Sequence, residues 1–169
     1  MKLELKKISE TEALLYFSQP LLLVGSFLAT KKNTEYSLLL PIISEEMTKR
    51  LLLTADFLYL ECYQKQQLDD LILIASAELD DWSTVSLKQE EMLSDDTEEK
   101  IDIILRVVVA PFLQRDGGDI QRVKIQDNIL SVRFLGKCQS CPYAQRTLKE
   151  CVEKNIIHYF PYIRGVVLV

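Results

Sequence analysis

Two cysteines near the C-terminus have the type and spacing of metal ligands. Cys138 and Cys141 are separated by two residues in the segment 136–142, which reads GKCQSCP. Such a pair, at a turn between a strand end and a helix start, can direct both sulfurs at one metal centre. A helix that begins at Pro142 would direct backbone N–H groups toward Cys141, which favours a thiolate and a bound anion. An iron–sulfur cluster held by four thiolates is such an anion.

One copy of the chain supplies only half of a four-thiolate site. The other two cysteines are Cys62, which alternates with Leu58 and Leu60 in an expected strand, and Cys151, on the apolar face of an expected helix. Free cysteine is among the most buried residue types, so we expect both to be small core residues. Two copies related by a two-fold axis, each giving Cys138 and Cys141, would complete the site.

Two other kinds of site fit the same spacing. A thiol–disulfide oxidoreductase would use Cys138 and Cys141 as attacking and resolving thiols, and a structural zinc site could form at the same interface. A thioredoxin-like pair follows a strand in a βαβ unit, whereas here a hairpin is expected before it. A second cysteine pair, which a zinc ribbon needs, does not occur in the sequence. The spacing alone leaves zinc open.

The residues around the pair predict an α+β domain. Apolar positions three and four apart, a glycine turn at 116–119 and the turn pair Asp127-Asn128 mark its elements. Pro111 is expected to kink or end the first helix, and Pro142 to begin the second. The predicted order is a helix from 97 to about 110, strands at 120–125 and 129–135, a helix from 142, and a strand at 165–169.

The remainder of the chain predicts a second, smaller α+β domain. Residues 1–93 hold 9 basic and 15 acidic side chains, whereas residues 94–169 hold 11 and 10. The acidic run between the two parts predicts an exposed linker. We therefore divide the chain into a domain at 1–88, a linker at 89–96 and a domain at 97–169. The first domain is expected to have strands near 3–5, 13–17 and 57–63 and helices at 44–52 and 68–79.

Composition excludes several classes of function. The chain has 169 residues, 48% of them hydrophobic, and a formal net charge of −5, which argues against binding nucleic acid or an anionic membrane. Its longest apolar stretches are too short to cross a bilayer, and its start shows no secretion signal or transit peptide. We expect a cytoplasmic protein, in a bacterial cytosol rather than a mitochondrial matrix. His158 is the sole histidine, and we expect no enzyme.

The region 97–169 joins several motifs in a fixed order: Pro111-Phe112-Leu113, Asp116-Gly117-Gly118-Asp119, the hairpin, Gly136-x-Cys138-x-x-Cys141-Pro142, and Thr147-Leu148-Lys149 with Val152-Glu153. In this combination the region resembles a known family, the NifU C-terminal (Nfu) domain of iron–sulfur cluster scaffold and carrier proteins. Residues 54–60 and Trp82 resemble a degenerate copy of the N-terminal domain that accompanies this module.

The resemblance implies a function for the cysteine pair. Members of the family hold a labile 4Fe-4S cluster between the C-x-x-C pairs of two subunits and pass it to apo-proteins. By resemblance, Cys138 and Cys141 are the cluster ligands and the chain forms a homodimer when it binds the cluster. Its other partners would be an upstream cluster donor and apo iron–sulfur client proteins.

Overall fold

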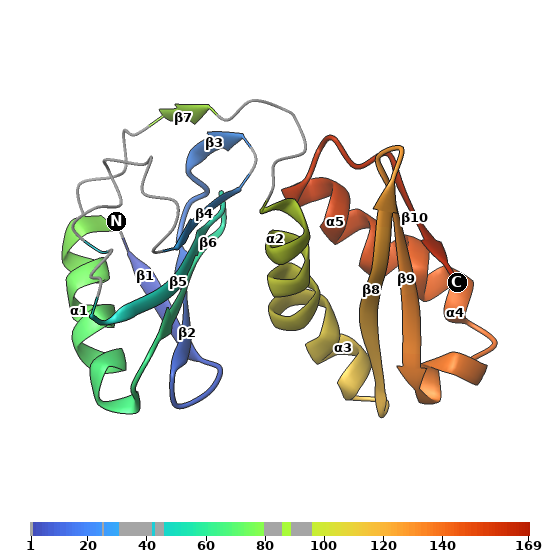
Figure 1. Ribbon diagram of the computed structural model, residues 1–169, viewed down its shortest axis with the longest axis horizontal. Coiled ribbons are helices and arrows are strands. Elements are labelled where there is room, and N and C mark those ends of the chain that lie inside the picture. The colour runs from blue at the N-terminus through green and yellow to red at the C-terminus, as the bar shows by residue number, and fades with distance from the viewer. Residues whose placement is uncertain (1, 25, 31–41, 43–45, 80–85, 89–95) are drawn as a thin grey trace. The chain divides into compact units, whose positions relative to one another are not determined.

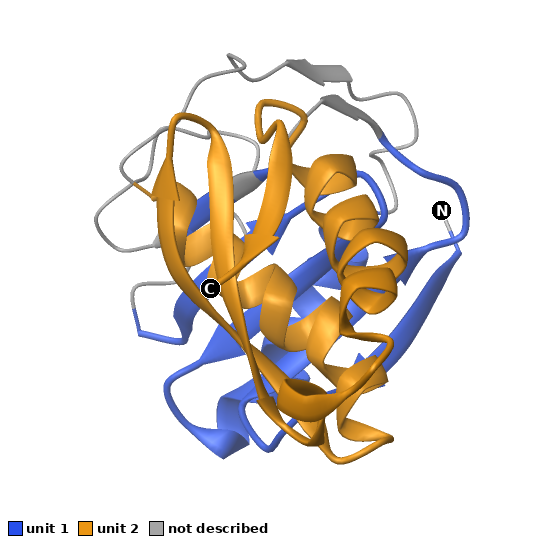
Figure 2. Cartoon of the chain, turned by 90° about the vertical axis from the view of Figure 1, so that its right-hand side faces the viewer, with its two compact units in different colours: residues 1–89 blue, residues 90–169 orange. Residues whose placement is uncertain are grey.

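A computed structural model describes residues 2–24, 26–30, 42, 46–79, 86–88 and 96–169. The chain divides into two compact units, residues 1–89 and 90–169 (Figure 2). Trp82 and most of the predicted linker lie outside the described residues. Among the helices of these ranges, none combines the length and apolar character that crossing a membrane requires.

Unit 1 is built on an antiparallel five-stranded sheet with the order β1-β2-β6-β5-β4 (Figure 1). Its elements are β1 (Leu3–Lys7), β2 (Glu12–Phe17), β4 (Phe27–Thr30), β5 (Thr48–Leu53), β6 (Phe57–Cys62), a 3-10 helix at Lys65–Gln67 and helix α1 (Leu68–Leu79). A short parallel pair joins β3 (Leu22–Val24) to β7 (Ser86–Lys88).

Helix α1 packs against one face of this sheet. Its buried residues fall three and four positions apart, as expected for one helical face. They form one core with alternate residues of the strands, among them Leu15, Leu58 and Leu60. The predicted helix at 68–79 and strand near 57–63 are confirmed.

The helix predicted at 44–52 is wrong, because Thr48–Leu53 form strand β5. This strand pairs with β4 on one side and β6 on the other, and Leu51, Leu52 and Leu53 are completely buried. Pairing on both edges and burial on both faces outweigh the local helix propensity of this segment. The expected cap, Ser44, lies outside the described residues.

Unit 2 has the predicted order of helix, strand, strand, helix and strand. Its sheet has the order β10-β9-β8, with β8 antiparallel and β10 parallel to the central β9. The strands are β8 (Gly118–Gln126), β9 (Ile129–Gly136) and β10 (Gly165–Leu168). The first helical segment comprises α2 (Thr97–Ile104), a π-helical turn (Leu105–Val109) and α3 (Ala110–Gln114); the second comprises α4 (Ala144–Thr147), a π-helical turn (Leu148–Glu153) and α5 (Lys154–Tyr159).

The hairpin and the helices share a single core. Leu130, Val132 and Phe134 alternate along β9 and are buried, whereas Arg133 between them is exposed. The two helical segments contact each other and the sheet. The hairpin turns at Asp127 and Asn128, whose φ values of 54° and 61° are those that a two-residue hairpin turn needs.

Both helix boundaries that proline was expected to set are displaced. The first helix continues past Pro111 to Gln114. A π-helical turn precedes the proline, with the Ala110 N–H donating to Leu105, and Pro111 lies in the first turn of α3, where a missing N–H is tolerated. The second helix begins at Ala144 rather than at Pro142, because residues 142 and 143 form a turn.

We predict that Glu61 stabilises unit 1 only when ionised. Its nearly buried carboxylate accepts a hydrogen bond from Lys49 Nζ at 2.6 Å and another from Arg50 Nε. Burial opposes ionisation, but the bonds from Arg50 and Lys49 outweigh it and lower the pKa of Glu61. A lowered folded-state pKa gives stability that is present above the unfolded pKa of about 4.3 and is lost as pH falls through the folded value.

The variant Glu61→Gln tests this contribution. At neutral pH it should lower the free energy of unfolding by about 1–3 kcal/mol, the usual value for a hydrogen bond to a charged group. The loss should shrink as the pH falls below the unfolded pKa of about 4.3 and vanish once it passes the lower folded value, where the native glutamate is protonated as well. Urea unfolding followed by circular dichroism measures both values, and an equal loss across the pH range would contradict the prediction.

Candidate metal centre

The two cysteines lie on one short loop directly after the central strand β9. Cys138 is in a 3-10 helix at Lys137–Ser140, and Cys141 follows it. Both thiols are free and partly exposed. The Cys141 N–H donates to the carbonyl of Cys138 at 3.4 Å, and the Ala144 N–H donates to the carbonyl of Cys141 at 3.1 Å. The loop therefore fixes the pair through its own backbone and leaves the sulfurs accessible to a ligand.

Glycines allow this loop to lie directly on the neighbouring strand. Gly136 and Gly118 are opposite each other in the β8–β9 register, and the Lys137 N–H donates to the carbonyl of Gly117 at 3.1 Å. Gly136 and Gly117 have φ values of +58° and +77°, in the region that favours glycine. A Cβ on Gly136 would lie 2.5 Å from the Gly117 carbonyl oxygen. The backbone therefore passes too close for any larger residue.

The second glycine of the 117–118 pair has a role that sequence reasoning missed. The sequence explains both glycines as parts of a tight turn, but Gly118 has no positive φ. Instead, a Cβ on Gly118 would lie 2.0 Å from Cys138 Sγ. The sulfur of Cys138 therefore occupies the space that Gly118 leaves empty. The signal that could have revealed this contact is the hairpin register, which places Gly118 across from the residue that begins the cysteine loop.

Burial and nearby charges both affect the thiol of Cys138. Burial raises the pKa of its thiol, and Cys141, Asp116 and Asp119 raise it further. Asp119 also accepts the Ile120 N–H at 2.9 Å, a bond to nearby backbone that is common for aspartate in turns. Because thiolates are the metal-binding form, a metal must displace protons from the pair when it binds.

The helix after the pair differs from the one that the sequence predicts. The expected helix start at Pro142 would direct free N–H groups toward Cys141. The structure begins α4 two residues later, and the first helical N–H, that of Ala144, binds the carbonyl of Cys141. The turn at Pro142 thus uses this donor to close the loop.

The other two cysteines and the histidine lie elsewhere. Cys62 is buried in the core of unit 1, where its thiol donates to the carbonyls of Thr11 and Gln64. Cys151 is partly buried in the second helical segment, and burial raises the pKa of its thiol. His158 is in the last turn of α5 with its ring 4.7 Å from that of Tyr159. Within the described ranges, no three His, Cys, Asp or Glu side chains gather in a way that could hold a metal ion.

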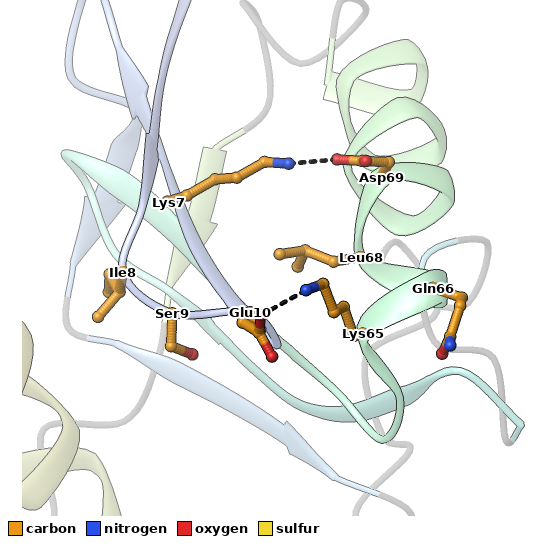
Figure 3. A pocket seen from close by; sticks show the side chains of 8 residues that line it. All are labelled: Lys7, Ile8, Ser9, Glu10, Lys65, Gln66, Leu68 and Asp69. Carbon is orange, nitrogen blue, oxygen red and sulfur yellow. Dashed lines mark hydrogen bonds and ion pairs between the residues drawn. The ribbon is translucent and has the colours of Figure 1, made fainter.

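A hollow in unit 1 is lined by paired charges and by no thiol. It measures about 640 Å³ and lies beside the 3-10 helix and the start of α1 (Figure 3). Lys7 Nζ pairs with Asp69 at 2.5 Å, and Lys65 pairs with Glu10, so the charges that line it neutralise one another. The cysteine loop remains the site with the donors of a thiolate metal centre.

The fold and this loop define the class of the C-terminal unit. It is an α+β domain in which a C-x-x-C loop is held between a β-hairpin and a helix. Residues 101–167 match the family described as the NifU-like domain, so this part of the chain belongs to that family. The predicted fold class and family are confirmed.

Curated relatives match stretches of this chain of similar length to that region. A protein of Pseudomonas aeruginosa named Fe/S biogenesis protein NfuA is 39% identical over 69 residues, which are 40% of this chain and 36% of the relative. Proteins of the same name from Buchnera aphidicola and Blochmanniella pennsylvanica are 36% and 30% identical over 75 and 79 residues. These alignments cover 44% and 46% of this chain, and 39% and 40% of the relatives. The matched region thus spans well under half of each relative.

We predict that Gly118→Ala disturbs the cysteine loop whereas Gly165→Ala does not. An added methyl at Gly118 must displace Cys138 Sγ, but at Gly165 it would meet Glu153 and Ile129 at ordinary distances of 3.7 and 3.8 Å. Overpacking at Gly118 should lower the free energy of unfolding by about 1–3 kcal/mol, against less than about 1 kcal/mol at Gly165.

Urea unfolding and the rate at which Cys138 reacts with a thiol reagent measure the two effects. The Gly118→Ala protein should differ from the unsubstituted protein in both, and the Gly165→Ala protein in neither. Equal stability and equal thiol reactivity in the two alanine variants would show that the contact does not position the sulfur.

Proposed function

We propose that this protein is a scaffold and carrier in iron–sulfur cluster assembly. In this proposal two copies hold one labile 4Fe-4S cluster between them, through Cys138 and Cys141 of each copy. The cluster is cargo, received from an upstream donor and passed to apo-proteins, and the protein acts without enzymatic turnover. The observation that carries the proposal is the pair of free, partly exposed thiols on the loop of a NifU-like domain.

The donor set fits a cluster. Cysteine thiolates are the usual ligands of 4Fe-4S clusters, and four are needed. The loop offers two thiols per chain. The other cysteines lie outside the loop, and Cys62 in particular is buried with its thiol hydrogen-bonded to the backbone. The names of the bacterial relatives, Fe/S biogenesis protein, support iron–sulfur chemistry over a zinc site or a redox disulfide.

Transfer requires that the ligands can be exchanged. An acceptor thiolate attacks an iron of the cluster, and the bond from that iron to Cys138 or Cys141 breaks, so thiolate replaces thiolate without any change in oxidation state. The partial exposure of both sulfurs supports this step, because a ligand sealed in a core could not be reached. The raised pKa of the Cys138 thiol also favours its protonation when it leaves the iron.

Anaerobic reconstitution with iron and sulfide tests the proposal. The unsubstituted protein should gain the broad visible absorption of thiolate-bound iron, bind one cluster per two chains and shift from monomer to dimer. Cys138→Ser or Cys141→Ser should abolish all three, because each removes one ligand from both halves of the site. Cys151→Ser is the matched control, a partly buried thiol outside the loop, and should leave cluster binding unchanged.

Other results would give the cysteine loop a different function. Cluster uptake by both loop variants would show that the ligands lie elsewhere. Zinc rather than iron in protein purified without air would identify a structural zinc site. A reversible disulfide between Cys138 and Cys141, with turnover by a dithiol and no need for iron, would identify an oxidoreductase.

A further inference from the structure

Two large apolar side chains are exposed at the end of unit 2 that carries the cysteine loop. Tyr143 is 67% exposed and Phe112 is 52% exposed. Tyr143 is in the turn between Cys141 and α4, and Phe112 is on α3, just before the glycine turn. Figure 1 shows that the end of α3, the start of β8 and the end of β9 lie at the same end of the unit.

Phe112 lies near the C-terminal end of α3, one helical turn before Asp116. The two side chains therefore project from neighbouring positions of the helix end. Asp116 is close enough to Cys138 to raise the pKa of its thiol. Tyr143 is two residues from the other ligand, Cys141. The two aromatic residues therefore belong to segments on either side of the loop in the chain, Phe112 to α3 and Tyr143 to the turn before α4.

The charges around this end have both signs. The Arg115 guanidinium lies over the ring of Phe112, 5.4 Å from its centroid. The aliphatic part of Lys137 covers Gly117, and a Cβ there would lie 3.2 Å from its Cδ. Asp116 and Asp119 supply the opposite charge beside them. A surface with aromatic anchors and both charges can be complementary to itself, as a two-fold interface requires.

We propose that Phe112 and Tyr143 are the apolar contacts through which two copies of this chain meet around the cluster. The partner on this surface is a second copy of the chain, because the thiol site is incomplete without one. The inference therefore rests on the proposed function. Because the contact is two-fold, it buries both residues in each of the two copies. The buried rings exclude water from the iron–thiolate bonds. The thiols bind the cluster that bridges the two copies, and the rings add to the strength with which the loaded dimer holds together.

The variants Tyr143→Ser and Phe112→Ser test the proposal, with Leu73→Ser as the matched control. Leu73 is 69% exposed on α1 in the other unit. All proteins are reconstituted at high concentration and then diluted, while sedimentation measures the dimer and visible absorption measures the cluster. The two loop-side variants should take up a full cluster when concentrated, dissociate at a protein concentration at least tenfold higher than the unsubstituted protein, and lose the cluster faster to an iron chelator. Leu73→Ser should match the unsubstituted protein.

A photo-crosslinker gives a second readout that does not depend on stability. With p-benzoylphenylalanine in place of Tyr143, illumination should give a covalent dimer only in the cluster-loaded state. The same group in place of Leu73 should not. These residues are not ligands, so each variant tests the contact and leaves the thiol pair in place.

The outcomes separate the contact from the proposed function. If the unsubstituted protein forms a cluster-bridged dimer but both serine variants dissociate and release iron as it does, the contact is wrong and the carrier function stands. A covalent dimer that forms equally from either position would overturn the contact too. If the unsubstituted protein takes up no cluster, both proposals fail.

Discussion

The cysteine loop depends on the close approach of two backbones, the end of β9 and the start of β8. Gly136 and Gly117 have conformations that favour glycine, and the Lys137 N–H bonds to Gly117 where the strands meet. Gly118 leaves the space in which Cys138 Sγ lies. Because a hairpin fixes which residues are opposite, the position of the sulfur is set by strand register rather than by the loop alone. A shift of one residue along β8 would remove the space for the thiol.

That register is in turn maintained by the core of unit 2. The buried apolar residues of β9 fall at alternate positions, so a one-residue slip would turn Leu130, Val132 and Phe134 out of the core. The turn at Asp127 and Asn128 fixes the other end of the hairpin, with two residues in the positive-φ region. The parallel strand β10 covers the second edge of β9. Apolar packing that is remote from the thiols therefore positions them.

Sequence reasoning predicted what depends on local pattern and missed what depends on tertiary packing. The order of the elements in unit 2, the hairpin turn and the burial of Cys62 all follow from periodicity and turn chemistry, and the structure agrees. Strand β5 was predicted as a helix, because its burial comes from strands that are distant in sequence. Pro111 was expected to interrupt its helix, but a π-helical turn accommodates it.

The site shows the same division between local pattern and spatial arrangement. The spacing of Cys138 and Cys141 suffices to identify a candidate metal centre, whereas the contact with Gly118 requires the register of two strands. The exposure of Phe112 and Tyr143 was not evident either, since an apolar residue beside a helix start is more often buried. Their exposure becomes informative only once the thiols are known to lie at the same end of the unit.

In the proposed carrier function, retention and release of the cluster are opposing requirements, and our proposals assign them to different groups. Retention of a cluster needs four thiolates and little water, whereas release needs ligands that another protein can reach. If both depended on the cysteines, stronger binding would always slow delivery. If retention also depends on apolar contacts between the copies, the cysteine ligands can stay partly exposed while those contacts control access to the cluster. In the proposed homodimer each copy offers the same half-site, so opening of the contact would allow acceptor thiolates to reach the one shared cluster. Because each copy supplies two of the four thiolates, separating the copies requires acceptor thiolates to replace those of one copy, and the apolar contacts would determine how readily they reach the iron.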